Sequence, residues 1–383
     1  MRNIIGAGLR SWLTIISLSF SFVVIIFLQG LYSGMNDQMQ VATINAEYGG
    51  GHYWHESYDP YDSQSLDKAH GLIPDRLAEL ITKEEAVPIL VQSATLYPKG
   101  RIQNVLLKGI PQDQTILTIP SFLLKCEGNE VGAIIGRRMA KKSKLQVGDY
   151  VTLRWRDANG TFDAIELRIN QIMESDVATI DNGIVWIDYE KMQELMLMEE
   201  EATLVVLKKG SSFSEEIREW DYKSLYFLTT DIRTLYLSKS IGGSIFYIIL
   251  LLLALLAVFD TQVLAIFHKR REIGTMMALG MSRFKLISLF TLQGAIHSVL
   301  AVFVGAIYGI PLLIYMSKTG FGLPASTDDF GYSIGSKVYP IYSLGLVVVT
   351  ILIVLTTTTI VSYLPTRKIA TLKPTDALRN KVN

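Results

Sequence analysis

The chain has 383 residues, with 36 basic and 36 acidic side chains and a single cysteine, Cys126. One cysteine excludes an intramolecular disulfide, so any domain outside a membrane must be held by its own core. A hydrophobic fraction of 49% is ordinary for a soluble protein, so the class of the chain depends on where its apolar residues lie.

Four stretches contain no Asp, Glu, Lys or Arg: 11–36, 240–259, 286–317 and 338–366. About 20 apolar helical residues cross a bilayer core of roughly 30 Å, so each stretch is long enough to span. The first could instead be a signal peptide. Its apolar part exceeds the roughly 7 to 15 residues typical of one, and no small-x-small cleavage site clearly follows, so we expect a retained anchor.

Basic residues gather beside these stretches on one side. They are Arg2 and Arg10 before the first stretch, Lys269, Arg270, Arg271, Arg283 and Lys285 between the second and third, and Arg367, Lys368, Lys373, Arg379 and Lys381 after the fourth. The positive-inside rule places these three segments in the cytoplasm, together with both termini. Residues 37–239 and 318–337 then lie on the other side.

The sequence therefore predicts a membrane protein with four transmembrane helices, one plus three, and a large α+β extracytoplasmic domain between helices 1 and 2. The expected parts are a cytoplasmic segment 1–10, helix 1 at 11–36, the domain at 37–239, helix 2 at 240–268, a cytoplasmic helix within 269–285, helix 3 at 286–317, an outer loop at 318–337, helix 4 at 338–364 and a tail at 365–383.

The expected outer domain carries 22 basic and 31 acidic residues, a net charge of −9. This charge argues against nucleic acid as its partner. Its two ends, at 32–48 and 233–239, look helical and would act as stalks joined to the spans. The glycines at 49–51 end the first stalk.

Strand and helix signals alternate along the domain. Residues 53–62 are expected as a loop or edge strand. Strands are expected at 89–96, 102–110, 131–135, 150–156, 162–173, 184–187 and 204–208, and helices at 74–81, 137–144, 189–198 and 214–222. Asn159-Gly160 is typical of a hairpin turn, and Ile165, Leu167 and Ile169 alternate with polar residues. This alternation predicts an exposed antiparallel sheet.

The loop between the second and third spans combines basic residues with a compact apolar segment. Met276, Met277, Leu279 and Met281 form a soft apolar cluster flanked by Lys269, Arg270, Arg271 and Arg283. Unbranched methionines suit insertion into a partner's groove, while charges orient the encounter. Ordinary positive-inside charge beside a buried helix is the alternative interpretation.

Four segments of the chain resemble the permeases of the MacB, LolC/LolE and FtsX group, which work with an ATP-hydrolysing partner. Residues 269–283 (KRREIGTMMALGMSR) are similar to the family's RRREIG-x-x-x-ALG-x-S/T-R, and 364–379 (LPTRKIATLKPTDALR) to P-x-R-x-A-x-x-x-P-x-x-A-L-R. Residues 135–153 resemble part of the family's periplasmic core domain, and 34–52 the segment after the first span in lipoprotein-releasing permeases. Met281 stands where the family usually has a small residue.

The resemblance implies that the loop is a coupling helix that receives ATP-driven closure from its partner. Its expected contact residues are Lys269, Arg270, Arg271, Glu272, Ile273, Gly274, Met276, Met277, Leu279, Gly280, Met281 and Arg283. The chain lacks G-x-x-x-x-G-K-[ST], so it should bind no cofactor itself, and ATP and Mg²⁺ should belong to a separate ATPase dimer. A symmetric ATPase pair implies a second permease chain, either a copy or a relative.

Several other sequence patterns could mark functional sites, but we expect most of them to have structural roles. His52 and His55 could present imidazoles to a metal, but they lie in a Gly-rich and Tyr-rich loop. The G-x-S-x-G at 331–335 lacks the sheet that a hydrolase elbow needs. Asp260 and His297 are ionisable groups in or near spans, where proton coupling is a lesser hypothesis. The glycines at 305 and 309, followed by Pro311, indicate close helix packing and then a bend.

A lipid-accessible substrate cavity is possible at the outer ends of the first two spans. Its candidate residues are Phe20, Phe27, Tyr32, Met35, Phe246 and Tyr247. The alternative, that these side chains simply face the bilayer, is equally open.

The leading hypothesis is a non-catalytic permease of the bacterial inner membrane that couples ATP hydrolysis to extracytoplasmic movement and releases lipoproteins or other amphiphilic cargo from membrane lipid. The alternatives are MacB-like export of peptides or drugs, FtsX-like regulation of a cell-wall hydrolase, and a membrane-anchored metal enzyme using His52 and His55.

Overall fold

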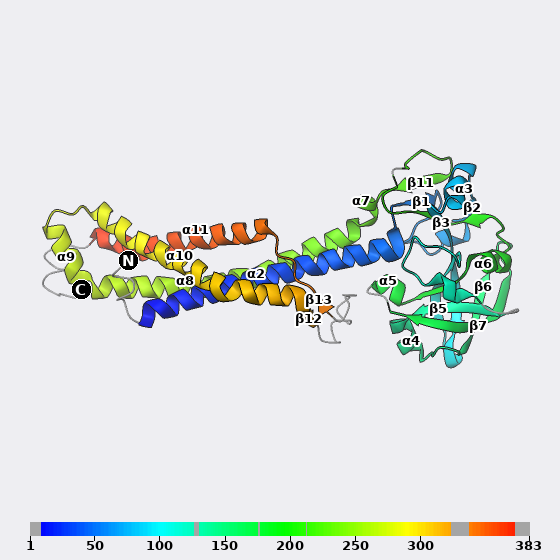
Figure 1. Ribbon diagram of the computed structural model, residues 1–383, viewed down its shortest axis with the longest axis horizontal. Coiled ribbons are helices and arrows are strands. Elements are labelled where there is room, and N and C mark those ends of the chain that lie inside the picture. Colours follow the sequence, from blue (N-terminus) through cyan, green and yellow to red (C-terminus); the bar gives the residue numbers. More distant parts are fainter. Residues whose placement is uncertain (1–8, 126–129, 175–176, 212, 323–336, 372–383) are drawn as a thin grey trace. The chain divides into compact units, whose positions relative to one another are not determined.

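The computed structural model describes residues 9–125, 130–174, 177–211, 213–322 and 337–371 (Figure 1). The chain forms two compact units. One is a helical unit that includes Leu235–Gly322, the described residues up to Met35 and those from Lys337 onward; the other is an inter-span domain, Asn36–Thr234. Cys126, the G-x-S-x-G at 331–335 and the end of the tail motif lie outside the described residues.

Among the described residues, four long helices are apolar enough to cross a membrane. Their most apolar stretches have a mean hydropathy between 2.2 and 2.7. They are α2 (Leu9–Thr43), α8 (Thr230–His268), α10 (Arg283–Thr319) and α11 (Leu344–Thr366). The one-plus-three arrangement around an α+β domain is therefore confirmed.

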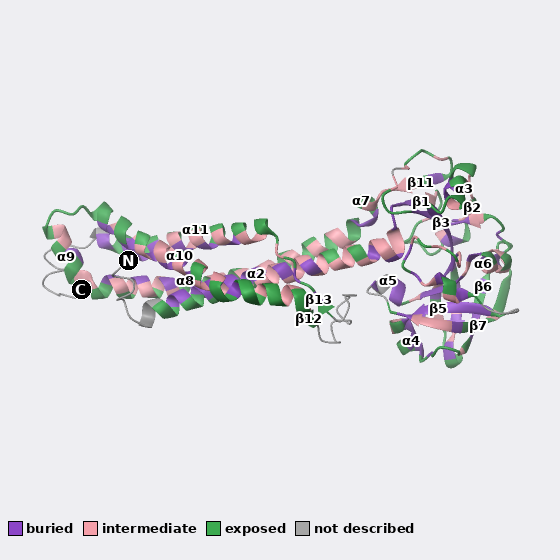
Figure 2. Ribbon diagram, in the orientation of Figure 1, coloured by how far each residue is buried: buried purple, intermediate pink, exposed green. Residues whose placement is uncertain are grey.

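All four helices contribute to one buried cluster in the helical unit. It contains Ile15, Leu18, Phe22, Val23, Ile26, Ala254, Val258, Ala301 and Val354. Figure 2 shows exposed residues along the outward faces of these helices, as expected where lipid takes the place of water. The unit also contains the short strands β12 (Phe321–Gly322) and β13 (Lys337–Val338) and the 3-10 turn η6 (Arg367–Thr371).

Small and hydroxyl-bearing residues line the contact between α10 and α11. Thr291 and Thr366 share a hydrogen bond of 3.1 Å between their hydroxyl oxygens. A Cβ on Gly294 would lie 2.1 Å from Oγ of Ser362, so the absence of a side chain allows this close approach. Such residues let membrane helices pack closely without an aqueous hydrophobic effect.

The glycine pair Gly30 and Gly34 on α2 seats the segment that precedes α11. The backbone N–H of Ile341 donates to the carbonyl of Gly30 at 3.0 Å. A Cβ on Gly34 would lie 2.1 Å from the carbonyl oxygen of Tyr339. Neither helix position can therefore carry a larger side chain without moving its neighbours.

Replacing Gly34 by Ala is expected to destabilise the helical unit by about 1–3 kcal/mol, because the new methyl group must displace the Tyr339 carbonyl. Thermal denaturation of the detergent-solubilised chain would measure the change. Gly242→Ala in α8 is the matched control, since no atom lies within 4 Å of its Cβ and Ala favours the helix. Equal melting temperatures for Gly34→Ala and the wild type would contradict the predicted clash.

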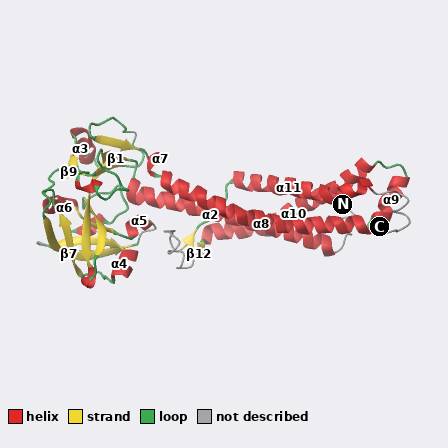
Figure 3. Ribbon diagram, turned by 180° about the vertical axis from the view of Figure 1, so that it is seen from behind, coloured by secondary structure: helices red, strands yellow, loops and turns green. Residues whose placement is uncertain are grey.

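The inter-span domain is built around a closed six-stranded barrel, whose strands are drawn in yellow in Figure 3. Neighbours pair in the order β3-β4-β8-β5-β7-β6, and β6 returns to β3. These strands are β3 (Ala86–Tyr97), β4 (Gln103–Ile110), β5 (Val131–Gly136), β6 (Tyr150–Arg156), β7 (Phe162–Met173) and β8 (Ile184–Asp188). Closure removes the exposed edges of the sheet.

A second sheet extends from the first half of β3. It continues through β10 (Leu204–Leu207) and β1 (His52–His55) to β11 (Trp220–Lys223). The remaining elements are β2 (Gly71–Leu72), β9 (Glu201–Ala202), α3 (Asp75–Thr82), α4 (Arg137–Ser143), α5 (Ala178–Asp181), α6 (Tyr189–Met196), α7 (Leu225–Leu228), and the 3-10 turns η2 (Ser65–Asp67), η3 (Pro98–Gly100) and η4 (Ser121–Leu124).

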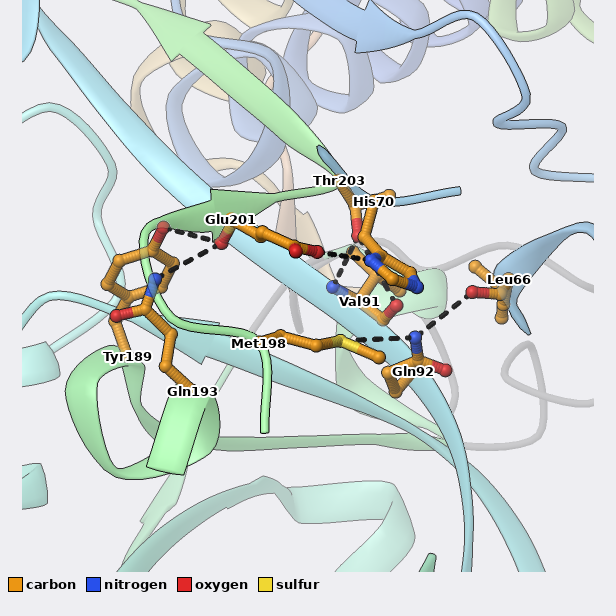
Figure 4. A network of polar contacts seen from close by, with 9 residues as sticks. All are labelled: Leu66, His70, Val91, Gln92, Tyr189, Gln193, Met198, Glu201 and Thr203. Carbon is orange, nitrogen blue, oxygen red and sulfur yellow. Dashed lines mark hydrogen bonds and ion pairs between the residues drawn. The ribbon is translucent and has the colours of Figure 1, made fainter. Parts of the chain in front are cut away.

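A polar network ties α6 and the β2–β9 pair to the barrel strand β3 (Figure 4). The carbonyl of Glu201 accepts hydrogen bonds from Oη of Tyr189, at 2.8 Å, and Nε2 of Gln193, at 3.2 Å. The Glu201 carboxylate also pairs with the imidazole of His70. Beneath them, Nε2 of buried Gln92 donates to the carbonyl of Leu66 at 3.0 Å. The network satisfies buried polar groups where the two sheets diverge.

Three sequence predictions for this domain are wrong in part. The expected exposed antiparallel pair forms as the β6–β7 hairpin, but β7 also pairs in parallel with β5, so the sheet is mixed and closes into a barrel. The segment 53–62 includes a strand inside the second sheet rather than at its edge. The helix expected at 214–222 is absent, and β11 occupies its end. Ile217 and Trp220 have helical spacing, but they pack against the core from the two sides of a tight turn, in which the N–H of Trp220 donates to the carbonyl of Ile217 at 3.1 Å.

Candidate coupling site

The loop between α8 and α10 is built around a short helix, α9 (Arg270–Ala278). Ile273 is fully buried and Gly274 is buried beside it. Ile273 packs in a cluster with Ile266, Leu286, Phe290 and Ile369, and Met276, Met277 and Ile287 pack against its edge. The apolar face of α9 therefore holds the helix against the ends of the neighbouring spans.

The end of α9 has the hydrogen bonds of a Schellman motif. The N–H of Met281 donates to the carbonyl of Met276 at 3.0 Å, and the N–H of Gly280 donates to that of Met277 at 3.1 Å. Gly280 has a φ of +93°, which favours glycine. Oγ of Ser282 then accepts from the N–H of Lys285 and caps α10. The sequence Ala-Leu-Gly-Met-Ser thus encodes one helix stop and one helix start.

The turn between α9 and α10 exposes large apolar side chains. Leu279 is 84% exposed, Phe284 79% and Met281 40%. We call these three residues the apolar tip. Met276 and Met277, by contrast, are half-buried, so the structure divides the four residues predicted to form one cluster.

Charged residues flank the apolar tip along the chain. Arg271, Glu272, Arg283 and Lys285 are exposed, and Lys269 and Arg270 are half-buried. An exposed apolar centre with a cationic rim can dock in a groove and orient by charge. Sequence reasoning missed Phe284. Its position between Arg283 and Lys285, before the third span, was the available signal.

The six candidate cavity residues have different surroundings. Phe20 and Phe246 are 60% and 66% exposed. Tyr32 and Tyr247 meet beside Gly243, where an added Cβ would lie 3.1 Å from the Tyr32 ring and 3.5 Å from the Tyr247 hydroxyl. The other two candidates are half-buried: Phe27, whose ring contacts that of Phe321, and Met35.

The ionisable and small residues of the spans have structural surroundings. Asp260 is exposed, whereas His297 is buried and its Nδ1 bonds the carbonyl of Gln293 at 2.7 Å. Gly305 and Gly309 both face Val23 of α2, with a Cβ on Gly309 only 2.7 Å from a Val23 methyl. Close packing between α10 and α2 explains both glycines.

Residues 244–374 match the family described as FtsX-like permease C-terminal, a match that includes α9, α10 and α11. This part of the chain is similar to the FtsX-like permease family. Members are non-catalytic subunits of ABC transporters, so ATP hydrolysis is carried out by a partner ATPase.

Two relatives of this permease are named lipoprotein-releasing system transmembrane protein LolC, from two strains of Xylella fastidiosa. They are 23% and 22% identical to it over 324 residues, covering 76% of this chain and 76% of each relative. A solved structure, the extracellular domain of the noncanonic ABC-type transporter YknZ from Gram-positive bacteria, is 17% identical. The structural alignment covers 42% of this chain and 84% of the YknZ domain chain, with a TM-score of 0.26.

The end of α2 is held in the inter-span domain by a set of contacts that we call the α2 anchor. The helix finishes in a π-helical turn, Ile44–Tyr48, closed by Gly49 donating to the carbonyl of Ile44 at 2.7 Å. Within this turn, Glu47 pairs with Nζ of Lys108 at 3.1 Å, and Lys108 is only 7% exposed. Nζ also lies 5.3 Å from the centre of the Trp186 ring.

His52 completes the α2 anchor. Nε1 of Trp54 donates to its Nδ1 at 3.0 Å, so Nε2 carries the proton and donates to the carbonyl of Glu47 at 2.9 Å. Both ring nitrogens are thus engaged. His55, three positions along the same strand, points to the opposite face, so the two imidazoles cannot converge on one metal.

Burial lowers the pKa of His52 to about 4, with nearby Lys108 acting in the same direction and Glu47 opposing it. In the unfolded chain His52 is protonated below about pH 6.5, whereas in the folded domain it stays neutral down to about pH 4. Stability is therefore expected to fall by about 3 kcal/mol as the pH drops through this window. Trp fluorescence melts of wild type and His52→Gln would test it. A pH dependence unchanged in His52→Gln would contradict the assignment.

The start of α8 is also fastened to the inter-span domain. Asp231 accepts a hydrogen bond from the hydroxyl of Tyr61. Just before the helix, Oγ of Ser224 caps α7, and the Lys223 ammonium lies 5.6 Å and 5.4 Å from the rings of Trp54 and Phe227. These contacts are more exposed than the α2 anchor, so we expect α8 to separate from the domain more readily.

Proposed function

We propose that this chain is the permease subunit of a LolC-type ABC complex that couples ATP hydrolysis on one side of the bacterial inner membrane to movement of the inter-span domain on the other. Its cargo is a lipoprotein or another lipidated molecule, which it releases from the membrane. The LolC relatives support this choice, since their similarity covers 76% of the chain, more than the permease family segment alone.

The apolar tip is the observation that carries the coupling role. Leu279, Met281 and Phe284 stand exposed inside a cationic rim, on a turn fixed by Gly280 and Ser282. This surface faces the cytoplasm in the proposed orientation, where a partner ATPase dimer holds ATP and Mg²⁺. Two ATPases related by a two-fold axis require two permeases, so a second copy or a related chain completes the complex.

The α2 anchor supports the proposed transmission of movement to the inter-span domain. A largely buried ion pair, a buried histidine and the backbone hydrogen bond from Thr118 to Asn45 join the last turn of α2 to the rest of the inter-span domain. Motion of that helix would therefore act on the whole domain rather than on a loose linker. The domain, with a net charge of −9 between residues 37 and 239, would present an acidic surface to cargo or carrier.

Mass spectrometry of the intact complex, purified in mild detergent, tests this proposal. We expect two permease masses, two ATPase masses and an acylated protein that leaves when ATP and Mg²⁺ are added. A co-purifying cell-wall hydrolase, with no acylated protein, would instead indicate regulation of that enzyme. Bound peptide or drug without lipid would indicate export, and either result would reject lipoprotein release.

A further inference from the structure

A pocket rich in basic residues lies at the end of the barrel, beside α4. It has a volume of about 500 Å³, and four cationic side chains line it: Lys99, Arg137, Lys141 and Lys144. We call it the basic pocket. It stands out because the domain as a whole is acidic, whereas residues 137–144 contain five basic residues and no acidic one.

Two local features bring these cations together. Lys144 ends α4 in the left-handed conformation, with its N–H donating to the carbonyl of Ala140. Oγ of Ser143 bonds Oε1 of Gln103 at 2.6 Å, which ties the end of α4 to the chain that follows Lys99. Lys99 itself has a φ of +50°. The convergence therefore depends on folding of the barrel end and not on one helix alone.

The charges of the basic pocket are mostly uncompensated. Arg137 pairs with Glu174, with both side chains largely exposed. Among the residues that the structure describes, no carboxylate forms an ion pair with Lys99, Lys141 or Lys144. Three ammonium groups around one small hollow repel each other, and an anion bound there would relieve that repulsion.

Apart from Gln146, the uncharged residues that line the pocket are apolar, and we call them its floor. They are buried Ala140 and Leu145 and half-buried Ile172. Close by in the chain, Ile102 and Val147 are 73% and 57% exposed. A hydrated inorganic ion gains nothing from such a floor, whereas an amphiphile can place its anionic group on the rim and its apolar part below.

We infer that the basic pocket binds the phosphate group of an anionic amphiphile, of which a phospholipid headgroup is the nearest example. An acidic peptide fits less well, because the volume admits a compact head rather than a chain. The inference does not rest on the proposed coupling role, since the pocket shares no residue with the apolar tip.

Lysine labelling of the full-length chain in neutral detergent, read by mass spectrometry, tests the site directly. The probe is dihexanoyl phosphatidylglycerol, compared with dihexanoyl phosphatidylcholine and with inorganic phosphate. We expect phosphatidylglycerol to protect Lys99, Lys141 and Lys144 and to leave Lys142 reactive, because Lys142 is exposed on the same helix but does not line the pocket. Readout at named lysines separates this site from lipid on the spans.

With the double substitution Lys141→Gln and Lys144→Gln, the probe concentration needed to protect Lys99 should rise by roughly tenfold to thirtyfold. Each lysine near the phosphate should contribute a similar share of the binding free energy, and two of them are removed. Lys142→Gln removes one charge from the same helix outside the pocket and should behave as wild type. Equal protection by inorganic phosphate would identify a free anion as the source. Protection by phosphatidylcholine to the same extent, uniform protection of all lysines, or none would overturn the inference.

Discussion

Leu279→Asp is expected to weaken binding of the partner ATPase by at least about 2 kcal/mol, roughly thirtyfold, and to uncouple its ATP hydrolysis from the permease. Leu279 is 84% exposed at the apolar tip, so the change should leave the fold intact. In a desolvated groove, however, the new carboxylate would lose its water without gaining a partner. Affinity and turnover, measured with the purified ATPase, report the two effects.

Two further variants separate docking from folding. Met277→Asp places a charge against the cluster around Ile273, so it should lower the melting temperature of the permease as well as binding. Leu197→Asp makes the same change as Leu279→Asp on an exposed leucine of the inter-span domain, and it should change neither quantity. If Leu279→Asp retains full affinity and coupled turnover, the apolar tip is not the docking surface.

Lys108→Met is expected to destabilise the inter-span domain by about 3 kcal/mol, the lower end of the range for breaking a buried ion pair. The lower end applies because Glu47 keeps 20% of its side chain exposed. Met preserves contact with the Trp186 ring, so the loss reports mainly the unpaired carboxylate. Denaturant unfolding followed by Trp fluorescence would measure it.

The matched comparison uses a double-mutant cycle. Adding Glu47→Met to Lys108→Met should recover most of the lost stability, because no charge is then left buried. Lys191→Met removes one partner of the surface pair with Glu194, and it should cost less than about 1 kcal/mol. Equal losses for Lys108→Met and Lys191→Met would show that the α2 anchor does not depend on its ion pair.

The helical unit and the position of the coupling segment could be predicted because both depend on local patterns. Charge-free stretches mark spans whatever their neighbours are, and Gly280 followed by Ser282 marks a helix stop and start in any context. Which side of α9 faces outward could not be predicted. Met276 and Met277 differ from Leu279 and Met281 only in their contact with Ile273 and the ends of the spans, which is a tertiary property.

The barrel was missed because its closure depends on one long-range pairing. Most of its strands were predicted near their observed positions, but alternation along β6 and β7 is the same in an open sheet and in a barrel. Closure requires Ala94–Tyr97 of β3 to pair with β6, after the first part of the same strand has paired with β10. No local signal distinguishes the two halves of β3. The basic pocket was missed for the same reason, since Lys99 reaches α4 only once the barrel is formed.

The α2 anchor also limits the kind of motion that can pass along the chain. Its contacts leave the last turn of the helix in several directions: Glu47 reaches Lys108, the Glu47 carbonyl receives His52, and the carbonyl of Asn45 receives the N–H of Thr118 at 2.9 Å. A helix held on several sides cannot rotate about its own axis without breaking bonds. The joint therefore resists torque as well as tension on the last turn of α2.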